Sequence, residues 1–365
     1  MIVSIYIVIV IYLLTMGWLV YGFSKINDFE VTNITPKTKF TIVVPFRDES
    51  KNLPILLESF SKLNYPIHLF EVILIDDDTI ETFKIPNLSF KMSVIKNKRI
   101  SNSPKKEAIT TAIEYVNTDW VITTDADCVV NKNWLLNLDE YINSHDVSMI
   151  AGAVTYNCKP TFLHHFQLLD FTSLQAVTIA SFGLGKGFLC NGANFAYKKS
   201  FFQALEGFKG NDQIASGDDV FLLQKAMSKF PEKVHYLKSK DTIVITKPLD
   251  NWQSLFQQRV RWVSKTSSFQ SYFGVCLGCV VFLTNMAWML AIGEFLLGFY
   301  PFQGMIFFFV LKFVAEMVLI HKANHFLNEG KLFYKVLGSL WYPFFTMAVV
   351  LYSFSGKYEW KGRKF

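Results

Sequence analysis

Long uncharged segments constrain this chain more than any other feature of its sequence. Residues 2–22 (IVSIYIVIVIYLLTMGWLVYG) contain no charged side chain, and a helix needs only about 20 apolar residues to cross a bilayer. The segment lacks the basic n-region and the small residues before a cleavage site that a secretory signal carries, so we interpret it as a retained anchor. With 51% hydrophobic and only 18% charged residues, the chain is too apolar for an ordinary soluble enzyme.

Two further apolar blocks lie near the C-terminus. Residues 269–320 are long enough for two helices joined by a tight turn near GFYPFQG (298–304), and residues 332–354 form a block that Pro343 interrupts. The predicted domains are an N-terminal transmembrane anchor (1–24), a catalytic domain (38–265), a C-terminal membrane region of two or three helices (266–355) and a basic tail (356–365).

Basic residues set the expected orientation. Lys25, Lys37 and Lys39 follow the first apolar segment, whereas almost nothing basic precedes it, and short loops rich in lysine and arginine stay in the cytoplasm. We therefore expect a multi-pass protein of the plasma or inner membrane with a cytoplasmic catalytic domain. The basic tail favours a cytoplasmic end as well, which requires the block around Pro343 to be re-entrant or interfacial. The net charge of +6 is interpreted as a basic surface beside anionic lipid, since no nucleic-acid-binding module appears.

The cysteines and the charges inside the apolar segments are interpreted as structural. The five cysteines do not suggest a disulfide framework, and Cys276 with Cys279, inside a predicted span, is interpreted as a small-residue packing face rather than a zinc or redox site. Lys312 and Glu316 stand four residues apart in another predicted span, where unpaired charges are costly, so we expect them to pair.

Between the apolar segments, strand-like and helix-like patterns alternate. Buried strands are indicated by FTIVVP (40–45) and FEVILIDDDT (70–79), and a strand that ends in acids by DWVITTDADC (119–128). Helices are indicated by NLPILLESFSKL (52–63) and SPKKEAITTAIEYV (103–116). This alternation predicts an α/β fold with a mostly parallel sheet, whose ligands gather outside the carboxyl ends of the strands. Both acidic clusters fall at such ends.

Asp125 and Asp127 form the most informative acidic pair. Ala126 between them lets both side chains address one small volume, and two carboxylates that share a site repel unless a cation lies between them. Hard oxygen ligands in ones and twos, completed by phosphate oxygens and water, suit Mg²⁺ or Mn²⁺ rather than zinc. The pair therefore predicts a site for a metal-bound diphosphate, while any single acid at a strand end has the alternative of capping the next helix.

An ordered set of motifs resembles the inverting glycosyltransferases of family 2, which have a GT-A fold and use a nucleotide-diphosphate sugar. The set covers about residues 40–265, and its most specific member is a Q-x-x-R-W pattern directly before an apolar segment. In chain order the motifs are VVPFRDE (43–49), LIDDDT (74–79), DAD (125–127), SGDDVFL (216–222) and QRVRW (258–262). The anchor, the C-terminal membrane block and WKGR (360–363) are most similar to the lipid glycosyltransferases related to ceramide glucosyltransferase.

On the donor side, the resemblance implies a role for each matching position. Asp77 resembles the acid that contacts the nucleoside, with Pro45 and Glu49 lining the same pocket. Lys105 resembles a lysine that many members place near the nucleotide, although Pro104 stands where the usual glycine would be. Asp76 is interpreted as a turn or capping residue.

On the acceptor side, Asp219 resembles the general base, with Asp218 as its rival. At the metal site between donor and acceptor, the resemblance implies that Asp125 would face the donor and that Asp127 would ligate Mg²⁺ or Mn²⁺. FLCNGANFAYKKSFF (188–202) resembles the segment that floors the acceptor pocket, where small residues keep the wall thin. The residues that would place the acceptor hydroxyl and the leaving diphosphate are Gln258, Arg261 and Trp262.

NWQSLFQQRVRWVSK (251–265) also has the pattern of an interfacial amphipathic helix, with Trp252 and Phe256 at the headgroup level, and both interpretations can hold together. Arg259 is expected to meet lipid phosphate or solvent. The almost uncharged residues 162–185 are interpreted as either a buried helix or an interfacial helix at the membrane.

The predicted function is transfer of one hexose or N-acetylhexosamine from a nucleotide-diphosphate sugar, with a UDP-sugar expected, to a lipid hydroxyl. A processive polysaccharide synthase of the same family is the alternative, although three C-terminal apolar blocks would make a thin-walled channel. A non-catalytic membrane scaffold is a further alternative. The presence of every expected acid argues against it. The identities of the sugar and the lipid and the oligomeric state stay open.

Overall fold

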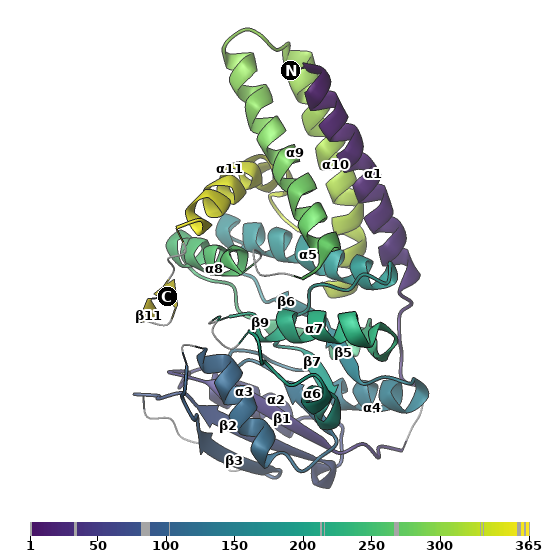
Figure 1. Cartoon of the computed structure of the whole chain (residues 1–365), viewed down its shortest axis with the longest axis vertical. Coiled ribbons are helices and arrows are strands. Elements are labelled where there is room, and N and C mark those ends of the chain that lie inside the picture. Colours follow the sequence, from purple (N-terminus) through teal and green to yellow (C-terminus); the bar gives the residue numbers. More distant parts are fainter. Residues whose placement is uncertain are drawn as a thin grey trace. The chain divides into compact units, whose positions relative to one another are not determined.

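The structure, a computed structural model, falls into two compact units. We call Met1–Lys25, Cys158–Phe188 and Pro248–Phe365 the helical unit, and Ile26–Asn157 with Leu189–Lys247 the α/β unit. Figure 1 labels their elements. The residues that the structure describes are 2–32, 35–81, 88–101, 103–211, 214, 216–265, 270–328, 330, 332–355, 359–360 and 363–364.

A seven-stranded sheet in the order β3-β2-β1-β4-β7-β5-β8 forms the centre of the α/β unit. Strands β1 to β4 are parallel, β7 runs antiparallel to both β4 and β5, and β5 is parallel to β8. The predicted α/β fold with a mostly parallel sheet is confirmed. The strands are β1 (Phe40–Phe46), β2 (Phe70–Asp76), β3 (Lys91–Lys96), β4 (Trp120–Thr123), β5 (Met149–Gly152), β7 (Phe195–Lys198) and β8 (Val234–Leu237).

Helices and a second, two-stranded sheet complete the α/β unit. Helices α2 and α3 follow the helical patterns predicted at 52–63 and 103–116. Trp134 at the start of α4 is fully buried against Phe60 of α2, with their rings stacked at 6.3 Å. The helices are α2 (Leu53–Ser61), α3 (Pro104–Tyr115), α4 (Trp134–Ser144), α6 (Lys199–Ala204) and α7 (Asp218–Lys229), and the small sheet pairs β6 (Val154–Tyr156) with β9 (Val244–Thr246).

The carboxyl end of β1 explains how the sheet opens toward its ligand edge. Strand β4 pairs with β1 only from Phe40 to Val43, so β1 continues beyond that point with a neighbour on one side alone. Pro45, which has no N–H to donate, lies in this one-sided stretch opposite Ile75 of β2. The chains that leave β1 and β4 therefore separate where the acidic motifs begin.

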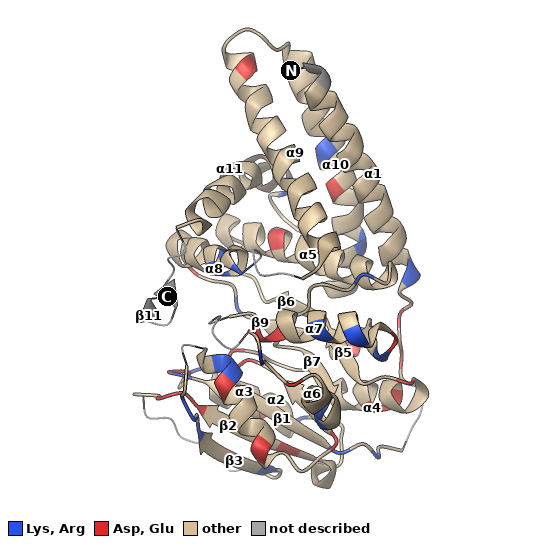
Figure 2. Cartoon of the chain, viewed as in Figure 1, with Lys and Arg blue, Asp and Glu red and all other residues tan. Residues whose placement is uncertain are grey.

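The helical unit contains four helices that are long and apolar enough to cross a membrane. Figure 2 shows long runs of α1 and α9 without charged residues. Helices α1, α9 and α10 pack side by side (Figure 1), and α9 and α10 are joined by a short turn, as predicted. The elements are α1 (Ile2–Lys25), α5 (Phe162–Gly183), α8 (Trp252–Ser264), α9 (Tyr272–Leu296), α10 (Phe302–Leu327), α11 (Lys335–Ser353), β10 (Glu359–Trp360) and β11 (Arg363–Lys364).

Pro343 lies inside α11, which continues through it. Whether this helix spans, re-enters or lies along a membrane stays a prediction. Part of the WKGR segment and most of the basic tail fall outside the described residues.

One polar contact links α1 to α10 within the helical unit. Lys312 is paired with Glu316, as predicted, and the Tyr12 hydroxyl donates to the same Glu316 oxygen at 2.7 Å. The prediction for the two cysteines of α9 is wrong, because Cys276 and Cys279 are exposed and do not pack within the chain. Which positions of a helix its neighbours cover is not revealed by the spacing alone.

Candidate active site

The acidic motifs follow the carboxyl ends of three neighbouring parallel strands. The N–H of Asp77, after β2, donates to the Phe46 carbonyl of β1 at 3.0 Å, and the N–H of Thr124, after β4, donates to the Val43 carbonyl at 3.2 Å. Both hydrogen bonds fix the acidic turns against β1. The predicted acids of β2 and β4 therefore lie at one edge of the sheet.

Asp77 is buried among nitrogen donors. Its side chain accepts a hydrogen bond from the Asn97 amide at 2.8 Å, and the Arg99 guanidinium lies 3.8 Å away. Arg47 donates to the Asp77 carbonyl at 3.4 Å. The carboxylate predicted to contact a nucleoside is thus held in place by its neighbours, and two guanidinium groups that the sequence reasoning did not single out lie beside it.

The other predicted donor residues lie in the turns beside Asp77. Pro45 is near the end of β1, and Glu49 lies just before α2, where its carboxylate accepts from the Asn52 amide at 2.6 Å. Asp76 accepts from the Thr79 N–H at 2.8 Å, which agrees with its predicted turn role. The nucleoside pocket itself stays a prediction.

Lys105 joins the acids that follow β4 to those that begin α7. Its ammonium lies 2.7 Å from an Asp125 oxygen and 3.4 Å from an Asp218 oxygen. Burial lowers the pKa of Lys105, but the charges of Asp125, Asp218 and Asp219 outweigh it and raise the pKa above its ordinary value. The lysine therefore stays charged, and we call Lys105, Asp125, Asp218 and Asp219 the acid–lysine cluster.

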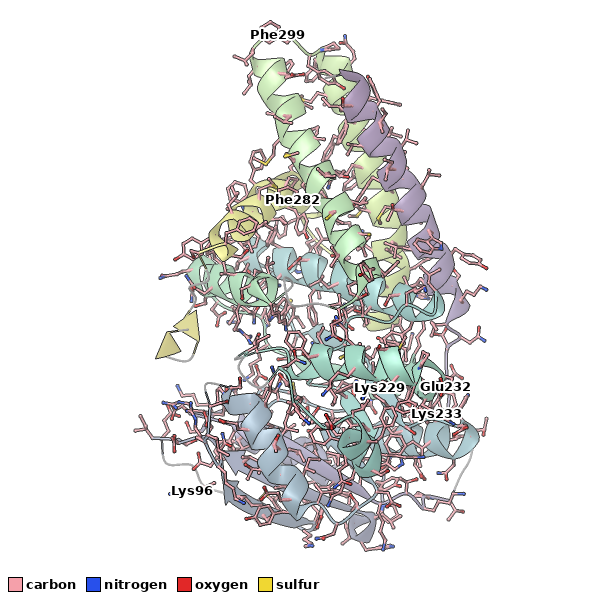
Figure 3. All side chains as sticks on the ribbon, viewed as in Figure 1. Lys96, Lys229, Glu232, Lys233, Phe282 and Phe299 are labelled. Atoms are coloured by element: carbon pink, nitrogen blue, oxygen red, sulfur yellow. The ribbon has the colours of Figure 1, made fainter. Side chains whose placement is uncertain are left out.

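Helix α7 begins at this cluster. Gly217 precedes the helix with a φ of +82°, a left-handed conformation that glycine adopts without strain. Asp219 in the first turn accepts from the Gly192 N–H at 2.8 Å and from the Val220 N–H at 2.7 Å. A helix N-terminus favours negative charge, whereas Lys229 ends the helix at its opposite pole (Figure 3).

Gly192 forms a close wall of the cluster. A Cβ at this position would lie 3.1 Å from both an Asp218 oxygen and the Lys105 ammonium. The Gly192 carbonyl also accepts from the Thr123 hydroxyl of β4 at 2.8 Å. A small residue is therefore needed here, in agreement with the thin wall expected for this segment, whose role as an acceptor floor stays a prediction.

Asp127 lies in the same turn as Asp125 and offers the second carboxylate of the predicted metal site. The Cys128 thiol lies 3.8 Å from an Asp127 oxygen, and burial, followed by the charges of Asp127 and Asp125, raises its pKa. The thiol therefore stays protonated beside the two carboxylates.

No group of three or more His, Cys, Asp or Glu side chains that could hold a metal occurs among the described residues. Two carboxylates at a strand end nevertheless fit Mg²⁺ or Mn²⁺, which take one or two protein carboxylates and complete their shell with phosphate oxygens and water. Asp127 and Asp125 are the residues that would hold such an ion.

Lys106 and Tyr197 are neighbours of the cluster that sequence reasoning missed. The Lys106 side chain is 2% exposed, donates to the Ile214 carbonyl at 2.8 Å and lies over the Phe221 ring of α7 at 4.9 Å. Burial and the charge of Asp218 raise the pKa of Tyr197, so its hydroxyl stays protonated. Neither residue carries a motif signal, because both depend on partners far away in the chain.

The three predicted acceptor residues, Gln258, Arg261 and Trp262, lie on α8 in the helical unit, and not in the α/β unit. The expectation that Arg259 meets lipid phosphate or solvent is wrong. Its side chain is buried and forms an ion pair with Asp170 of α5 at 2.7 Å. The helix turn places this arginine on the side that packs against α5.

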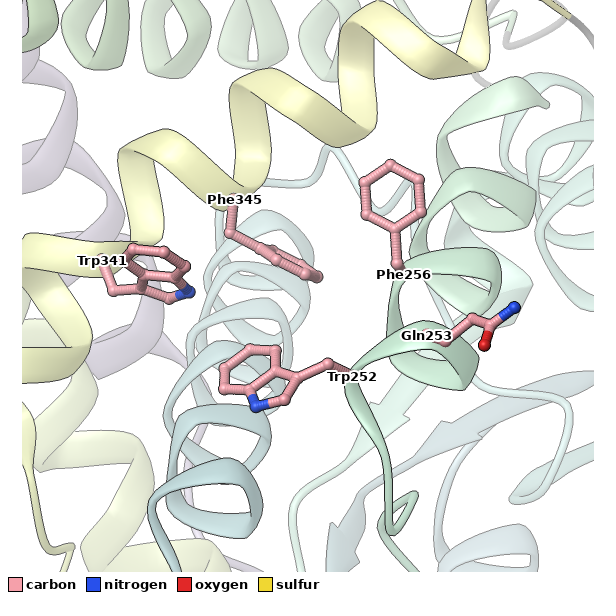
Figure 4. Close-up of a pocket in the computed structure, with 5 residues that line it drawn as sticks. All are labelled: Trp252, Gln253, Phe256, Trp341 and Phe345. Carbon is pink, nitrogen blue, oxygen red and sulfur yellow. The ribbon is translucent and has the colours of Figure 1, made fainter.

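An apolar pocket of about 390 Å³ lies between α8 and α11. Figure 4 shows aromatic rings from both helices around it, with Phe345 between Trp252 and Phe256 at centroid distances of 6.0 and 6.1 Å. The lining residues are Trp252, Gln253, Phe256, Trp341 and Phe345. None of them is charged, so the pocket suits an uncharged, apolar group.

The sheet order and the acids at its edge define the class, a mixed α/β fold of the GT-A type. Residues 41–205 match the family model for glycosyl transferase family 2. The fold-class and enzyme predictions are thereby confirmed.

The chain is similar to proteins of known activity, of which one curated sequence and one solved structure are described below. Poly(ribitol-phosphate) beta-N-acetylglucosaminyltransferase TarS from Staphylococcus aureus is 30% identical over 120 residues, which are 31% of this chain and 20% of TarS. The match thus spans about a fifth of that relative. The structure of mannosyltransferase PcManGT from Pyrobaculum calidifontis, in complex with GDP-Man and Mn²⁺, aligns with a TM-score of 0.57 at 16% identity, covering 97% of this chain and 98% of that one. This likeness shows a shared fold.

Proposed function

We propose that the protein is a membrane-bound, inverting hexosyltransferase that moves one hexose or N-acetylhexosamine from a UDP-sugar to a lipid hydroxyl. Within family 2, we place it near the ceramide glucosyltransferase-related enzymes, because the apolar N-terminal segment, the C-terminal apolar block and WKGR (360–363) resemble theirs. The observation that carries the proposal is the acid–lysine cluster, which lies at the carboxyl edge of the sheet in a domain that matches the family.

On the donor side, the buried Asp77 carboxylate would accept a hydrogen bond from a nucleobase N–H, and the guanidinium groups of Arg47 and Arg99 add positive charge beside it. A divalent ion held by Asp127 and Asp125 would neutralise the charge that develops on the departing diphosphate. Lys105 keeps a permanent positive charge next to Asp125 and limits the repulsion among the acids.

On the acceptor side, Asp219 is the proposed general base. Two backbone N–H groups hold its carboxylate in a fixed orientation. It takes the proton of the acceptor hydroxyl while the hydroxyl oxygen forms a bond to the anomeric carbon, and the bond from that carbon to the diphosphate oxygen breaks. This single displacement inverts the anomeric centre, and the nucleoside diphosphate leaves.

A lipid acceptor is supported by the helical unit. Four of its helices have the length and composition of membrane spans, and the α8–α11 pocket offers an uncharged aromatic surface to a hydrocarbon chain. Gln258, Arg261 and Trp262 lie on the same helix as three of the pocket residues. In this proposal the α/β unit is cytoplasmic, where nucleotide sugars are the donors.

Replacing Asp219 tests the proposed chemistry. Asp219→Asn keeps the shape of the side chain but cannot accept a proton, so transfer should fall by about 10³-fold or more while donor affinity stays within about two-fold. Purified full-length protein in nanodiscs would be assayed for sugar transfer and for nucleotide-sugar binding. Asp146→Asn, at an exposed surface ion pair, is the matched control and should change neither quantity. Normal turnover of the Asp219 variant would exclude it as the base.

The acceptor class has its own test. Mass spectrometry of lipids from cells with and without the chain should reveal a lipid that gains one sugar. The second candidate function, transfer to a polymer, is favoured by the similarity to TarS, whose name specifies poly(ribitol-phosphate). A water-soluble polymer product, with no change among the extracted lipids, would support that candidate instead.

A further inference from the structure

Two arginines of the QRVRW segment have different environments on α8. An α-helix turns about 100° per residue, so residues two apart lie on nearly opposite sides of the helix. Arg261 is half-buried, whereas Arg259 is almost fully buried. The Arg259 Nε donates to an Asp170 carboxylate oxygen of α5 at 2.7 Å, and each of these two side chains is 7% exposed.

The same guanidinium contacts two residues that the proposed function uses. Its carbon lies 4.2 Å from the centroid of the Trp262 ring, which is a cation–π contact. Its Nη1 donates to the Gln258 side-chain oxygen. Trp262 also packs against Phe171, the residue that follows Asp170 on α5, at a centroid distance of 6.2 Å. Arg259 therefore connects the anchor on α5 to both side chains.

We propose that Arg259 is a positioning residue, which its ion pair with Asp170 locks in one orientation so that Gln258 and Trp262 are held ready for the acceptor. This inference rests on the proposed function, which takes Gln258 and Trp262 as the residues that place the acceptor. The planar guanidinium is suited to the task, because it donates to the carboxylate and the amide while its face lies on the indole ring. A lysine would keep the charge but could not make this set of contacts.

The alternative hypothesis is a purely structural role, in which the Arg259–Asp170 ion pair only joins α8 to α5 and does not orient Gln258 or Trp262. Removing only one partner leaves a buried charge without its counterpart and destabilises the protein under either hypothesis. Removing both charges separates the hypotheses. Asp170→Asn combined with Arg259→Met leaves no buried charge at this place, so thermal stability should return close to that of the unmodified protein.

The experiment measures transfer by full-length protein in nanodiscs made from a total cell lipid extract, with UDP-glucose and UDP-N-acetylglucosamine as donors. In the neutral double variant we expect kcat to fall about ten-fold or more, because small misplacements of positioning groups are costly, while the donor KM stays within about two-fold. Arg259→Lys should show the same split between kcat and KM. The matched control is Lys312→Met with Glu316→Gln, which neutralises another buried ion pair of the helical unit and should leave transfer unchanged.

A spectroscopic measurement makes the result independent of activity. The near-UV circular dichroism of Trp262 is obtained by subtracting the spectrum of the Trp262→Phe counterpart, and it should lose about half of its amplitude or more in the double variant. A stable double variant with unchanged kcat and an unchanged Trp262 signal would overturn the positioning role and leave the proposed function standing. If the unmodified protein transfers no sugar to lipid, the proposed function fails, and an unchanged Trp262 signal would still refute the held orientation.

Discussion

Replacing Lys105 by methionine should expose how strongly the acid–lysine cluster depends on one positive charge. The substitution keeps the length of the side chain and removes the ammonium that lies 2.7 Å from Asp125 and 3.4 Å from Asp218. Asp218 is 9% exposed at its side chain and would lose its nearby cation, whereas Asp125, at 39%, can be solvated in part. Most of the loss therefore comes from Asp218.

The expected magnitude follows from these contacts. A hydrogen bond to a charged group contributes about 1.5–3 kcal/mol, and the one from Lys105 to Asp125 contributes less because Asp125 is partly exposed. The ion pair with the buried Asp218 adds to it, so we expect a total loss of about 2–3 kcal/mol in the free energy of unfolding. For a unit of about 190 residues, each kcal/mol lowers the Tm by about 2–4 °C, which predicts a decrease of about 4–12 °C. Differential scanning fluorimetry of the full chain in detergent would measure it.

Lys62→Met provides the matched control, because the Lys62–Glu58 pair is exposed on both sides and should change the Tm by less than about 1 °C. Addition of Mn²⁺ at millimolar concentration should restore only part of the lost Tm of Lys105→Met, since a divalent ion at Asp125 replaces the positive charge there while most of the loss comes from Asp218. A decrease no larger than that of the control would refute the reasoning that Lys105 holds the acids together.

Three further outcomes are expected. Asp127→Ala should lose Mn²⁺-dependent binding of a UDP-sugar, measured by calorimetry, and binding that is equally strong with and without metal would contradict its assignment as a ligand. Lys106→Met should reduce transfer by about ten-fold, because the loop before α7 loses the ammonium that donates to Ile214, and unaltered kinetics would show that the loop is held by other contacts. Because the fold raises the pKa of Lys105, its contribution to stability is complete below about pH 10.4 and disappears only above that value; the Tm difference between Lys105→Met and the unmodified protein should thus stay constant from pH 6 to 9.

Local patterns predicted the elements of the α/β unit well. The β-branched run of β1 is buried on both faces, and the helical pattern at residues 103–116 became α3. The order of the strands could not be predicted from the sequence, because β7 lies between β4 and β5 in the sheet and runs antiparallel to both. That choice depends on pairing between segments about 75 residues apart in the chain, and no local propensity encodes it. For the same reason, the apolar pattern of α5 did not reveal which unit the helix joins.

The acids of the candidate site could be found from sequence because they follow strand ends and stand in fixed spacings. Lys105 was found through a motif, even though Pro104 breaks the usual pattern. Arg99 and Lys106 escaped because their partners are a carboxylate and backbone carbonyls brought near by the fold. Every residue has a backbone carbonyl, so no residue type in the sequence marks the partner of such a lysine. From the sequence, a lysine that donates to a backbone carbonyl therefore cannot be told apart from a lysine on a solvated helix face.

The two arginines of α8 show the physical limit of a motif. The spacing alone predicts that Arg259 and Arg261 lie on opposite sides of α8, so at most one of them can point directly into the interface with another helix. Which one does so is decided by Asp170, which lies 89 residues earlier in the chain and is buried on α5. A buried carboxylate needs a cation, and the arginine on its side of the helix is the available one. The interior arginine is therefore occupied by this ion pair. Under the proposed function, Arg261 would then be the one of the two that serves the leaving diphosphate.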